Sequence, residues 1–560
     1  MHINNNNTSI ASTGAELLVQ CLEEQGVQYI FGIPGAKVDT IFDVLSDHGP
    51  RLILCRHEQN AAFMAGMIGL LTGTPGVCLV TSGPGVTNLT TGLSTATCDG
   101  YPLVALGGNV RRGMRHIKTH QCLNNVGVMQ PVTKYAVEVY DGNSIPEVVV
   151  NAFRQSITPP LGASFISLPQ DVLVGAVDTT PIRFFPPGGR GAFSVEAVKN
   201  AAAIINSAKM PVVFAGVSAS RPEVTQALRR LLNQYPMPFV NTYQASGVLP
   251  RELFNCYAGS LGIFQNQPGD RLLKKADVVI TVGFDPVEYD PETWNKGREG
   301  TIISIENHIP VIDKYYQPKM ELLGEIATNI DELAKHLRPR MDDPTSNPLV
   351  MEVQDALLEA KALGARQSGF PIHPMRLIYE MRNLIGDDVT VVCDVGSIYV
   401  WMARYFASYE PRRLLFSNGQ QTLGVALPWA IATTLARPGE KVISMSGDGG
   451  FLFSAMELET AVREKSNFVH LVWRDGSYDL VKIQQQLKYG RSFGVEFGSV
   501  DIVKFAESFG AIGLRINSTD DITPLLSRAL NLTGPVIVDI PIDYSTNQNL
   551  CAAVHEDVGH

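Results

Sequence analysis

The segment from Lys441 to Asp475 constrains the fold of this 560-residue chain more than any other stretch. Two short apolar runs, 442–445 and 468–473, flank a stretch of helical character around 456–463. Strand, helix and strand in this order predict one βαβ unit with two parallel strands. The C-terminal ends of such strands open on the same edge of the sheet, where ligands of open α/β sheets bind.

Each of these predicted strands ends in an acidic turn. Asp448 lies in Ser-Gly-Asp-Gly-Gly and Asp475 in Arg-Asp-Gly-Ser, so we expect the two carboxylates to emerge side by side. Carboxylate and carbonyl oxygens suit Mg²⁺ or Ca²⁺, and Gly449 and Gly450 allow amide N–H groups to approach an anion. The pattern favours a metal-bridged phosphate or diphosphate site. Gly-Asp-Gly taken alone also fits a plain strand-ending turn, because both residues are common in turns.

Length and composition limit the class of protein. A chain of 560 residues is too long for one core and predicts about three domains. With 45% apolar and 18% charged residues the composition is that of a packed globular protein. The formal net charge of −10 argues against nucleic acid or an anionic membrane as a partner.

The cysteines and apolar runs indicate a soluble cytoplasmic protein. Eight scattered cysteines form no Cys-x-x-Cys pair, and we expect them to be buried and reduced. The polar stretch Met1–Thr8 lacks the features of a secretory signal. No apolar run approaches the roughly 18 residues that suggest a membrane span.

Strand and helix patterns alternate along the chain, which predicts an α/β protein of three doubly wound parallel-sheet domains. Linkers are predicted at 181–191 and 338–347 by composition. The expected domains are residues 11–182, 192–337 and 370–546, named below as the N-terminal, middle and C-terminal domains.

The N-terminal and C-terminal domains share a weak repeat. Residues 80–85, Val-Thr-Ser-Gly-Pro-Gly, resemble residues 445–449, Met-Ser-Gly-Asp-Gly, and both precede a predicted helix and strand. The first copy lacks the acidic residue. Two related domains of which only one carries an acidic site suggest that a cofactor is held between them.

Several motifs in fixed order resemble the thiamin diphosphate decarboxylase and ligase superfamily. Gly-Asp-Gly at 447–449 is followed at the expected spacing by Asp475-Gly476, where that superfamily has two asparagines. Further motifs are Phe-Gly-Ile-Pro-Gly at 31–35, Arg-His-Glu-Gln-Asn-Ala-Ala at 56–62, Ser-Gly-Pro-Gly at 82–85 and Asn-Gly-Gln-Gln-Thr-Leu-Gly at 418–424. The resemblance spans about residues 14–544 and is strongest to the catabolic acetolactate synthases.

The resemblance implies a set of cofactor and metal residues. Asp448, Asp475 and the backbone carbonyl of Ser477 match Mg²⁺ ligands. The residues that match the binding site of thiamin diphosphate are Gly396, Ser397, Gly449 and Gly450 at its diphosphate, Leu423 as the apolar wedge, the Gln421 carbonyl at the aminopyrimidine, and also Pro34 and Tyr478.

Glu58 matches the carboxylate that faces a pyrimidine ring nitrogen and supports proton transfer in this superfamily. Without the resemblance, His57-Glu58 at a strand end reads as a solvated loop. Lys37 and Gln421 match partners of the substrate carboxylate, and His120 and Gln121 match the opposite wall. Lys37 fits a surface lysine equally well.

The implied reaction is the decarboxylation of pyruvate and its condensation with a second pyruvate to (S)-2-acetolactate, which feeds acetoin and butanediol formation. This makes the chain a transferase of the carboligase type. The resemblance also implies a homo-oligomer, at least a dimer and in the family a tetramer, without a regulatory subunit.

Rival functions fit parts of this sequence. Biosynthetic acetohydroxyacid synthases carry FAD and an Arg-Phe-Asp-Asp-Arg run, whereas residues 283–289 read Gly-Phe-Asp-Pro-Val-Glu-Tyr, so FAD is not expected. Those enzymes also have a Trp that favours 2-ketobutyrate, where this chain has Gln484. A simple 2-keto acid decarboxylase and a catalytically silent nucleotide-binding regulator also stay open. Tyr101, Cys122 and Asn124 depart from the family near the expected substrate wall.

Overall fold

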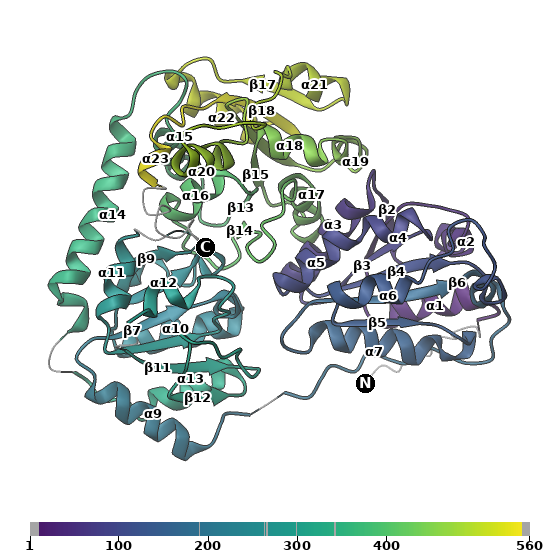
Figure 1. Cartoon of the computed structure of the whole chain (residues 1–560), viewed down its shortest axis with the longest axis horizontal. Helices are drawn as coiled ribbons and strands as arrows, with labels where there is room; N and C mark the ends of the chain where they lie inside the picture. Colours follow the sequence, from purple (N-terminus) through teal and green to yellow (C-terminus); the bar gives the residue numbers. More distant parts are fainter. Residues whose placement is uncertain are drawn as a thin grey trace. The chain divides into compact units, whose positions relative to one another are not determined.

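The computed structural model describes residues 11–550 except 190, 263, 265, 266, 298, 299, 341 and 342. The polar Met1–Thr8 stretch and Cys551 lie outside the described residues. The described residues form three six-stranded sheets whose strands all pair in parallel. This confirms the predicted α/β class with three doubly wound sheets (Figure 1).

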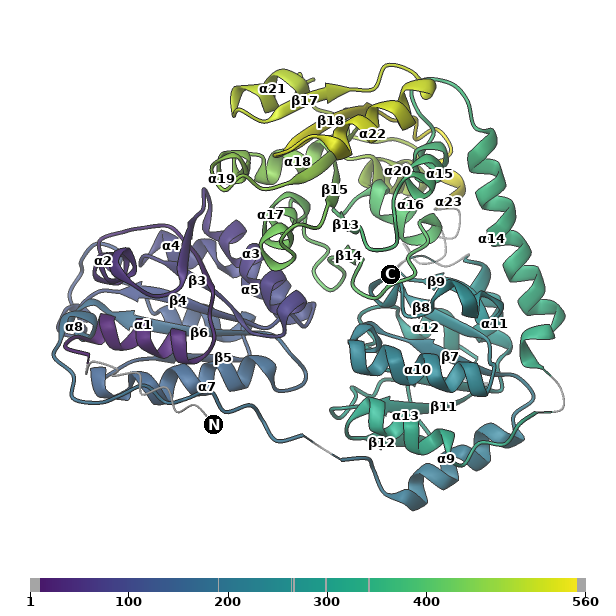
Figure 2. The same ribbon diagram turned by 180° about the vertical axis from the view of Figure 1, so that it is seen from behind.

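The first sheet has the strand order β2-β1-β3-β4-β6-β5. Its strands are β1 Tyr29–Gly32, β2 Arg51–Leu54, β3 Gly76–Val80, β4 Leu103–Asn109, β5 Tyr135–Glu138 and β6 Ala163–Pro169. Its helices are α1 Gly14–Glu24, α2 Asp39–Asp47, α3 Glu58–Thr72, α4 Pro84–Asn88, α5 Thr90–Cys98, α6 Asn125–Met129, α7 Ile145–Ile157 and α8 Gln170–Val174. Helix α1 packs with α2, α7 and α8, and α3 packs with α4 and α5; Figures 1 and 2 show these helices from opposite sides.

The third sheet repeats this order as β14-β13-β15-β16-β18-β17. Its strands are β13 Thr390–Cys393, β14 Leu414–Phe416, β15 Val442–Gly447, β16 Phe468–Arg474, β17 Ile512–Arg515 and β18 Val536–Pro541. Its helices are α15 Pro374–Leu384, α16 Ser397–Tyr405, α17 Ala426–Ala436, α18 Asp448–Ser454, α19 Glu457–Arg463, α20 Asp479–Tyr489, α21 Ile502–Ser508, α22 Ile522–Asn531 and α23 Asn547–Leu550. The equal order agrees with the repeat seen in the sequence, because β3 and β15 take the same place.

The middle sheet has a different order, β12-β11-β10-β7-β8-β9. Its strands are β7 Pro211–Ala215, β8 Phe239–Thr242, β9 Tyr257–Leu261, β10 Val278–Val282, β11 Thr301–Glu306 and β12 Met320–Leu323. Its helices are α9 Val195–Ser207, α10 Pro222–Gln234, α11 Pro268–Lys275, α12 Pro291–Asn295 and α13 Ile326–Ala334. This is the strand order of dinucleotide-binding sheets, with the switch point where β7 and β10 are neighbours.

The chain divides into two compact units. The first contains residues 1–188, 431–438 and 456–466, so helix α19, although it connects two strands of the third sheet, lies in the same unit as the first sheet. The second contains the remaining residues, with the middle sheet and the strands of the third. The three domain boundaries expected from the sequence stay predictions.

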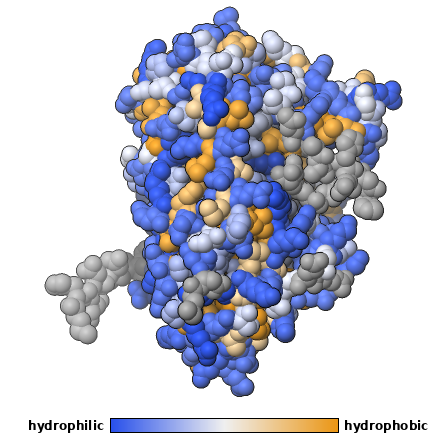
Figure 3. Space-filling view, turned by 90° about the vertical axis from the view of Figure 1, so that its left-hand side faces the viewer, coloured by the Kyte–Doolittle hydropathy of each residue, from blue (hydrophilic) through white to orange (hydrophobic). Residues whose placement is uncertain are grey.

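Helix α14, Pro348–Arg366, was not predicted and follows the expected linker at 338–347. It begins after Asn347, whose side chain accepts from the Leu349 N–H as an N-cap, and with Pro348 at the first position. Figure 1 shows the helix running along the second unit from the middle sheet to α15. Its apolar residues Met351, Leu358 and Leu363 are each about half exposed. Figure 3 views the molecule from the side on which α14 lies in Figure 1 and shows a band of apolar side chains there.

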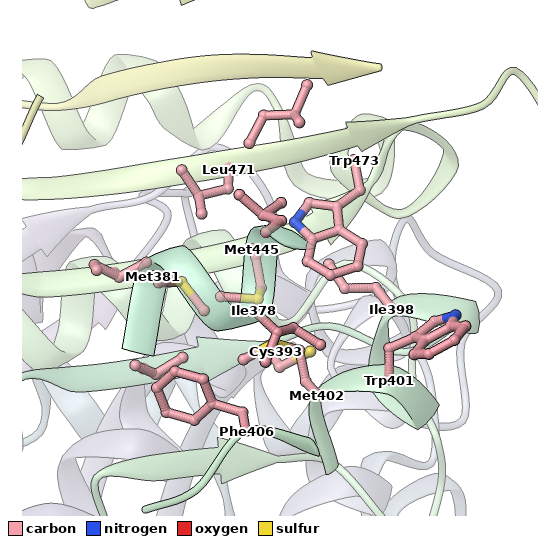
Figure 4. Packing of buried hydrophobic residues seen from close by; sticks show 14 of the residues in the cluster. Ile378, Met381, Cys393, Ile398, Trp401, Met402, Phe406, Met445, Leu471 and Trp473 are labelled. Atoms are coloured by element: carbon pink, nitrogen blue, oxygen red, sulfur yellow. The ribbon is translucent and has the colours of Figure 1, made fainter. Parts of the chain in front are cut away.

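The predicted βαβ unit is part of the core of the third sheet. Strands β15 and β16 pair in parallel from Val442 opposite Phe468 to Gly447 opposite Trp473, which confirms the parallel pair. Met445, Leu471 and Trp473 are fully buried beside side chains of α15 and α16 (Figure 4). This packing holds the C-terminal ends of both strands at one edge.

A buried histidine joins the same two strands and makes their stability depend on pH. His470 is fully buried, and its ring nitrogens lie 2.8 Å from the hydroxyls of Ser444 and Ser446. Burial lowers the pKa of His470 to about 3. The unfolded chain, with the ordinary pKa of about 6.5, therefore binds more protons than the folded chain between pH 6.5 and 3, and folded stability falls as the pH falls through this window.

We expect His470→Gln to remove this dependence, because an amide can bond both serines and does not titrate. The free energy of unfolding of the wild type should fall by about 2 kcal/mol relative to the variant between pH 7.5 and pH 5. Urea unfolding at both pH values measures the change. A difference between the two proteins that stays constant with pH would contradict the prediction.

The cysteines follow the prediction in part. All seven in the described residues are free, and Cys21, Cys55, Cys78, Cys256 and Cys393 are buried as expected. Cys98 is exposed and Cys122 half-buried, so burial was wrong for these two: Cys98 ends helix α5 at its surface, and Cys122 lies in a loop. None of the described helices is long and apolar enough to cross a bilayer.

Candidate active site

The edge of the third sheet brings Asp448 and Asp475 together, as predicted. Asp448 is the first residue of α18, and its Oδ2 accepts the Gly476 N–H at 2.9 Å, beside Asp475. From the sequence Asp448 was expected in a turn after the strand, but the helix begins at this residue without an intervening turn. Its carboxylate therefore lies at a helix N-terminus, and Asp448 is only 5% exposed.

The electrostatics of this edge favour a cation. Burial raises the pKa of Asp448, and the pKa of Asp475 is raised to about 7, mainly by burial and further by the charges of Asp448 and Asp479. The hydroxyl of Ser477 donates to Asp475 and offsets part of this rise. A bound divalent cation would stabilise the ionised form of these crowded, buried carboxylates. In the part of the chain that the structure describes, no three His, Cys, Asp or Glu side chains converge as metal ligands, so a cation here would rely on two carboxylates and backbone or diphosphate oxygens.

A second acidic residue, Asp479, organises the neighbouring helix start. It begins α20 and accepts hydrogen bonds from the Ser397 hydroxyl and from the Asn547 side chain. Ser397 is the first residue of α16, and Gly396 before it has φ of +133°, which favours glycine. Gly396 and Ser397 thus form a strand-to-helix turn whose amide groups can face an anion. Asp479 was missed in the sequence, although it stands only four residues after Asp475.

The two glycines after Asp448 allow close approaches. A Cβ at Gly449 would lie 2.7 Å from the Tyr478 ring, so only glycine lets this predicted cofactor residue cover the turn. A Cβ at Gly450 would lie 3.3 Å from the carboxylate of Asp394. Tyr478 is partly exposed and packs against Phe497 with ring centroids 5.1 Å apart.

Asp394 ties the turn of Gln421 and Leu423 to this edge. It is 1% exposed and accepts the Gly424 N–H with both carboxylate oxygens at 3.0 Å. From the other side, the Ser454 hydroxyl of α18 donates to the Gly424 carbonyl at 2.6 Å. Leu423 is half-buried in the turn held this way. Asp394 was not singled out from the sequence, although an acidic residue directly after a buried strand was an available signal.

The backbone of Gln421 is in the left-handed region. Its φ is +48°, which is uncommon for a residue other than glycine, and its side chain is exposed. Gln484 lies on α20, which begins at Asp479, and is half-buried. The second unit therefore gathers every predicted metal and diphosphate residue at one sheet edge, with Gln484 on an adjoining helix.

In the first unit Glu58 begins helix α3. Without the resemblance it was expected in a solvated loop, and this was wrong: Glu58 is the first residue of α3, which His57 caps with its Nδ1, accepting the Gln59 N–H at 3.1 Å. The Glu58 side chain is half-buried and accepts a hydrogen bond from the Asn88 amide at 2.9 Å. A carboxylate at a helix N-terminus that is fixed through one oxygen by a neutral donor can accept a hydrogen bond from a ligand with its other oxygen.

Gln121 lies against the turn that follows β3. The Ser82 hydroxyl donates to its Oε1 at 3.0 Å, and a Cβ at Gly83 would lie 2.9 Å from the Gln121 Cβ. Gln121 has φ of +59° and an exposed side chain, and His120 before it is also exposed. The structure thus joins Gln121 to the Ser-Gly-Pro-Gly motif, whereas no described hydrogen bond places His120.

Lys37 and Pro34 occupy the loop after β1. Lys37 is half-buried, with its Cβ close to Gly108 at the end of β4, and Pro34 is exposed. Lys37 forms no salt bridge with any described carboxylate, so its ammonium group is available to an anionic ligand.

The three departures from the family take ordinary structural roles. Tyr101 is 3% exposed and packs beside Gly66 of α3, and its expected place near the substrate wall stays a prediction. Asn124 accepts the Gly127 N–H as the N-cap of α6, and the Cys122 thiol lies near the Arg115 carbonyl.

Family models match all three sheets. Residues 12–128 match the N-terminal TPP-binding domain of thiamine pyrophosphate enzymes, 198–333 their central domain and 394–540 their C-terminal TPP-binding domain. The chain therefore belongs to the thiamine pyrophosphate enzymes, in the group formed by the acetolactate synthases. It is 51% identical to acetolactate synthase of Bacillus subtilis (strain 168) over 97% of this chain and 95% of that protein. It is 44% identical to "Acetolactate synthase, catabolic" of Raoultella terrigena over 97% of both chains, and 29% identical to the acetolactate synthase isozyme 1 large subunit of Escherichia coli (strain K12) over 95% of this chain and 94% of that protein.

Proposed function

We propose that the chain condenses two molecules of pyruvate to 2-acetolactate with release of carbon dioxide, using thiamin diphosphate and Mg²⁺ without FAD. The observation that carries this proposal is the acidic edge of the third sheet, where Asp448 and Asp475 stand beside glycine-rich helix starts. The full-length likeness to acetolactate synthases supports the choice of substrate.

The second unit would hold the cofactor. Asp448, Asp475 and the Ser477 carbonyl would bind Mg²⁺, and the turns at Gly396-Ser397 and Gly449-Gly450 would bind the diphosphate with backbone amides. Leu423, in the turn held by Asp394 and Ser454, would provide an apolar contact to the cofactor. Thiamin diphosphate, when bound, supplies the carbon centre that accepts the electron pair released on decarboxylation.

The first unit would supply the proton and the substrate contacts. Glu58 would hold a proton at its carboxylate toward the cofactor ring, with Asn88 fixing the other oxygen. Lys37 and Gln121 would orient the pyruvate carboxylate, and the Ser82 hydroxyl keeps the Gln121 amide in place. These groups would position the two reactants.

Independence from FAD is supported by Glu288 in the middle sheet. This buried side chain accepts the Val217 N–H at 2.9 Å and the Asp285 N–H at 3.0 Å, and the Thr242 hydroxyl also donates to it. Val217 follows β7 at the switch point, where a dinucleotide would place its phosphates. The amide groups that would bind such a ligand are already engaged by the protein's own carboxyl.

The test is pyruvate turnover by the purified full-length protein with thiamin diphosphate and Mg²⁺, with acetolactate assayed directly. We expect acetolactate without added FAD and no flavin absorbance in the protein. Product only after FAD is added would overturn the FAD-independent part of the proposal. Acetaldehyde as the sole product would indicate a simple decarboxylase, and no turnover at all would favour the silent regulator.

Gln484 predicts the acceptor preference. The Gln484→Trp variant is expected to raise the preference for 2-ketobutyrate over pyruvate as acceptor by about 10-fold. The reason is that contact with a large apolar surface makes the binding free energy of an acceptor with one extra methylene more favourable by about 1 to 3 kcal/mol. Competition of the two acceptors, with product ratios measured by mass spectrometry, gives the value. Lys488→Trp, an exposed position on the same helix, is the matched control. Equal product ratios in the wild type and Gln484→Trp would remove Gln484 from the acceptor site.

Homo-oligomerisation predicts complementation between inactive chains. The family resemblance places Glu58 of one subunit at a cofactor held by another, so co-expressed Glu58→Gln and Asp448→Ala chains should form hybrid dimers with one intact site. With random assembly we expect about a quarter of wild-type activity. Light scattering of the purified protein should show at least a dimer. Absence of any recovered activity in a verified hybrid would contradict a shared site.

A further inference from the structure

Glu457 is a buried carboxylate that faces the residues just before Glu58. It begins helix α19 in the first unit and is fully buried. Its Oε1 accepts the backbone N–H of Arg56 at 2.9 Å and of His57 at 3.1 Å. The same oxygen also accepts from the Asn60 side chain at 3.0 Å, one turn into α3. One carboxylate oxygen thus accepts hydrogen bonds from two residues that precede Glu58 in the sequence and from one that follows it.

The other oxygen of Glu457 is fixed as well. The Thr460 hydroxyl lies 2.6 Å from Oε2 and 3.3 Å from the Leu54 carbonyl at the end of β2. Asn60 and Thr460 are both fully buried. Hydrogen bonds to a carboxylate are stronger than those between neutral groups, and buried donors left unpaired are costly. The Glu457 side chain holds the segment at Arg56, His57 and Asn60, and Thr460, bonded to Glu457, also bonds to Leu54.

This arrangement differs from an ordinary helix cap. The cap of α3 is already made by the His57 ring, which accepts the Gln59 N–H. Glu457 instead accepts from the two amides that precede the first helical residue, so it fixes the direction in which the chain enters α3. Glu58 is that first residue, and Asn88 restrains only the far end of its side chain.

We infer that Glu457 is a positioning residue for Glu58: it holds the Arg56-His57 backbone so that the Glu58 carboxylate meets the cofactor in a reactive orientation. The inference rests on the proton-holding role proposed for Glu58. Positioning of reacting groups carries large effects on rate, and a displacement near 1 Å costs on the order of 100-fold. The described hydrogen bonds of the Glu457 side chain all go to Arg56, His57, Asn60 and Thr460.

Two substitutions separate positioning from proton transfer. Glu457→Gln keeps an oxygen for Arg56, His57 and Asn60, and its amide can donate to Thr460, whose hydroxyl can turn to Leu54. Glu457→Leu has a similar size and accepts nothing. We expect kcat for acetolactate to fall by no more than about 3-fold in Glu457→Gln and by about 30- to 100-fold in Glu457→Leu, with KM for pyruvate nearly unchanged. Glu459→Gln, on the same helix and paired only with Arg463 among the described contacts, is the matched control and should behave as wild type.

The second readout is amide hydrogen exchange of residues 54–60 in the protein without cofactor. The Arg56 and His57 amides should be protected like core amides in the wild type and in Glu457→Gln, and should exchange at least about 10-fold faster in Glu457→Leu. If Glu457→Leu does not fold, the wild-type measurement still decides: exchange of these two amides at loop rates overturns the inference. Loss of activity in Glu457→Gln equal to that in Glu457→Leu also overturns it, because a proton-transfer role would then explain the data.

The same variants distinguish failure of the positioning role of Glu457 from failure of the role proposed for Glu58. Full activity in Glu58→Gln would refute the role of Glu58 whatever Glu457 does. Loss of activity in Glu58→Gln together with normal rates and exchange in Glu457→Leu would refute only the positioning role.

Discussion

Glu58→Gln is expected to lower kcat for acetolactate formation by about 1,000-fold while leaving the affinity for thiamin diphosphate and Mg²⁺ within a few-fold. The amide has the same shape and can keep the hydrogen bond from Asn88, but it cannot hold a proton as a carboxylate does. Steady-state kinetics and calorimetric titration of the cofactor measure the two quantities. The affinity should survive because the predicted diphosphate and metal residues all lie in the second unit.

The control for Glu58→Gln is Asp39→Asn, which removes one negative charge at the start of another helix of the same unit. Asp39 is exposed, so this variant should keep wild-type rates. If Glu58→Gln retained full activity, the proton would have to be held elsewhere, and the assignment by resemblance would be wrong. A loss of cofactor affinity as large as the loss of rate would instead make Glu58 a binding residue.

Asp448→Ala is expected to weaken Mg²⁺-dependent binding of thiamin diphosphate by at least about 100-fold and to abolish turnover at ordinary cofactor concentrations. Asp448 is the more buried of the two carboxylates and also accepts the Gly476 N–H, so its loss removes a ligand and loosens the turn that carries Asp475. Calorimetric titration of the cofactor at several Mg²⁺ concentrations measures the effect. Removal of Mg²⁺ by a chelator from the wild type should produce the same loss, reversed by adding the metal back.

Asp475→Asn is the matched control for Asp448→Ala. An asparagine keeps an oxygen ligand and can still accept the Ser477 hydroxyl, and relatives by resemblance carry asparagine at this place. We expect binding and turnover within about 5-fold of wild type. Equal losses in both variants would mean that the charge of Asp475 is required, and unaffected binding in Asp448→Ala would refute the metal site.

The strands that end at the acidic edge could be predicted, because a buried strand appears in the sequence as a continuous apolar run. The runs 442–445 and 468–473 match β15 and β16 to within two residues. Helix starts were harder to predict: Glu58 and Asp448 were expected in a loop and in a turn, yet each is the first residue of a helix, and for Asp448 that helix follows its strand directly. The cap of α3 is a histidine ring nitrogen, which no common capping pattern reveals.

Features that depend on distant contacts could not be read from the sequence. Gln121 and Gln421 have positive φ values without being glycine, because Ser82 and Gly83 hold the first and the turn closed by Asp394 holds the second. Short strands such as β9, β12 and β14 were missed since three to five residues give little periodic signal. Helix α14 was missed although Asn347-Pro348 is a recognisable helix start.

The equal strand order of the first and third sheets has a consequence for how such a protein can change. Position by position, the turn after β3 in one sheet corresponds to the turn after β15 in the other. In the third sheet this place holds Asp448, whereas in the first it holds Gly83-Pro84 with Gln121 lying over it. A chain with two copies of one edge can keep the ion-binding chemistry in one copy and give the other to a different ligand. If the proposed function holds, substrate choice can therefore change at the first edge without disturbing the residues proposed to bind the cofactor at the second.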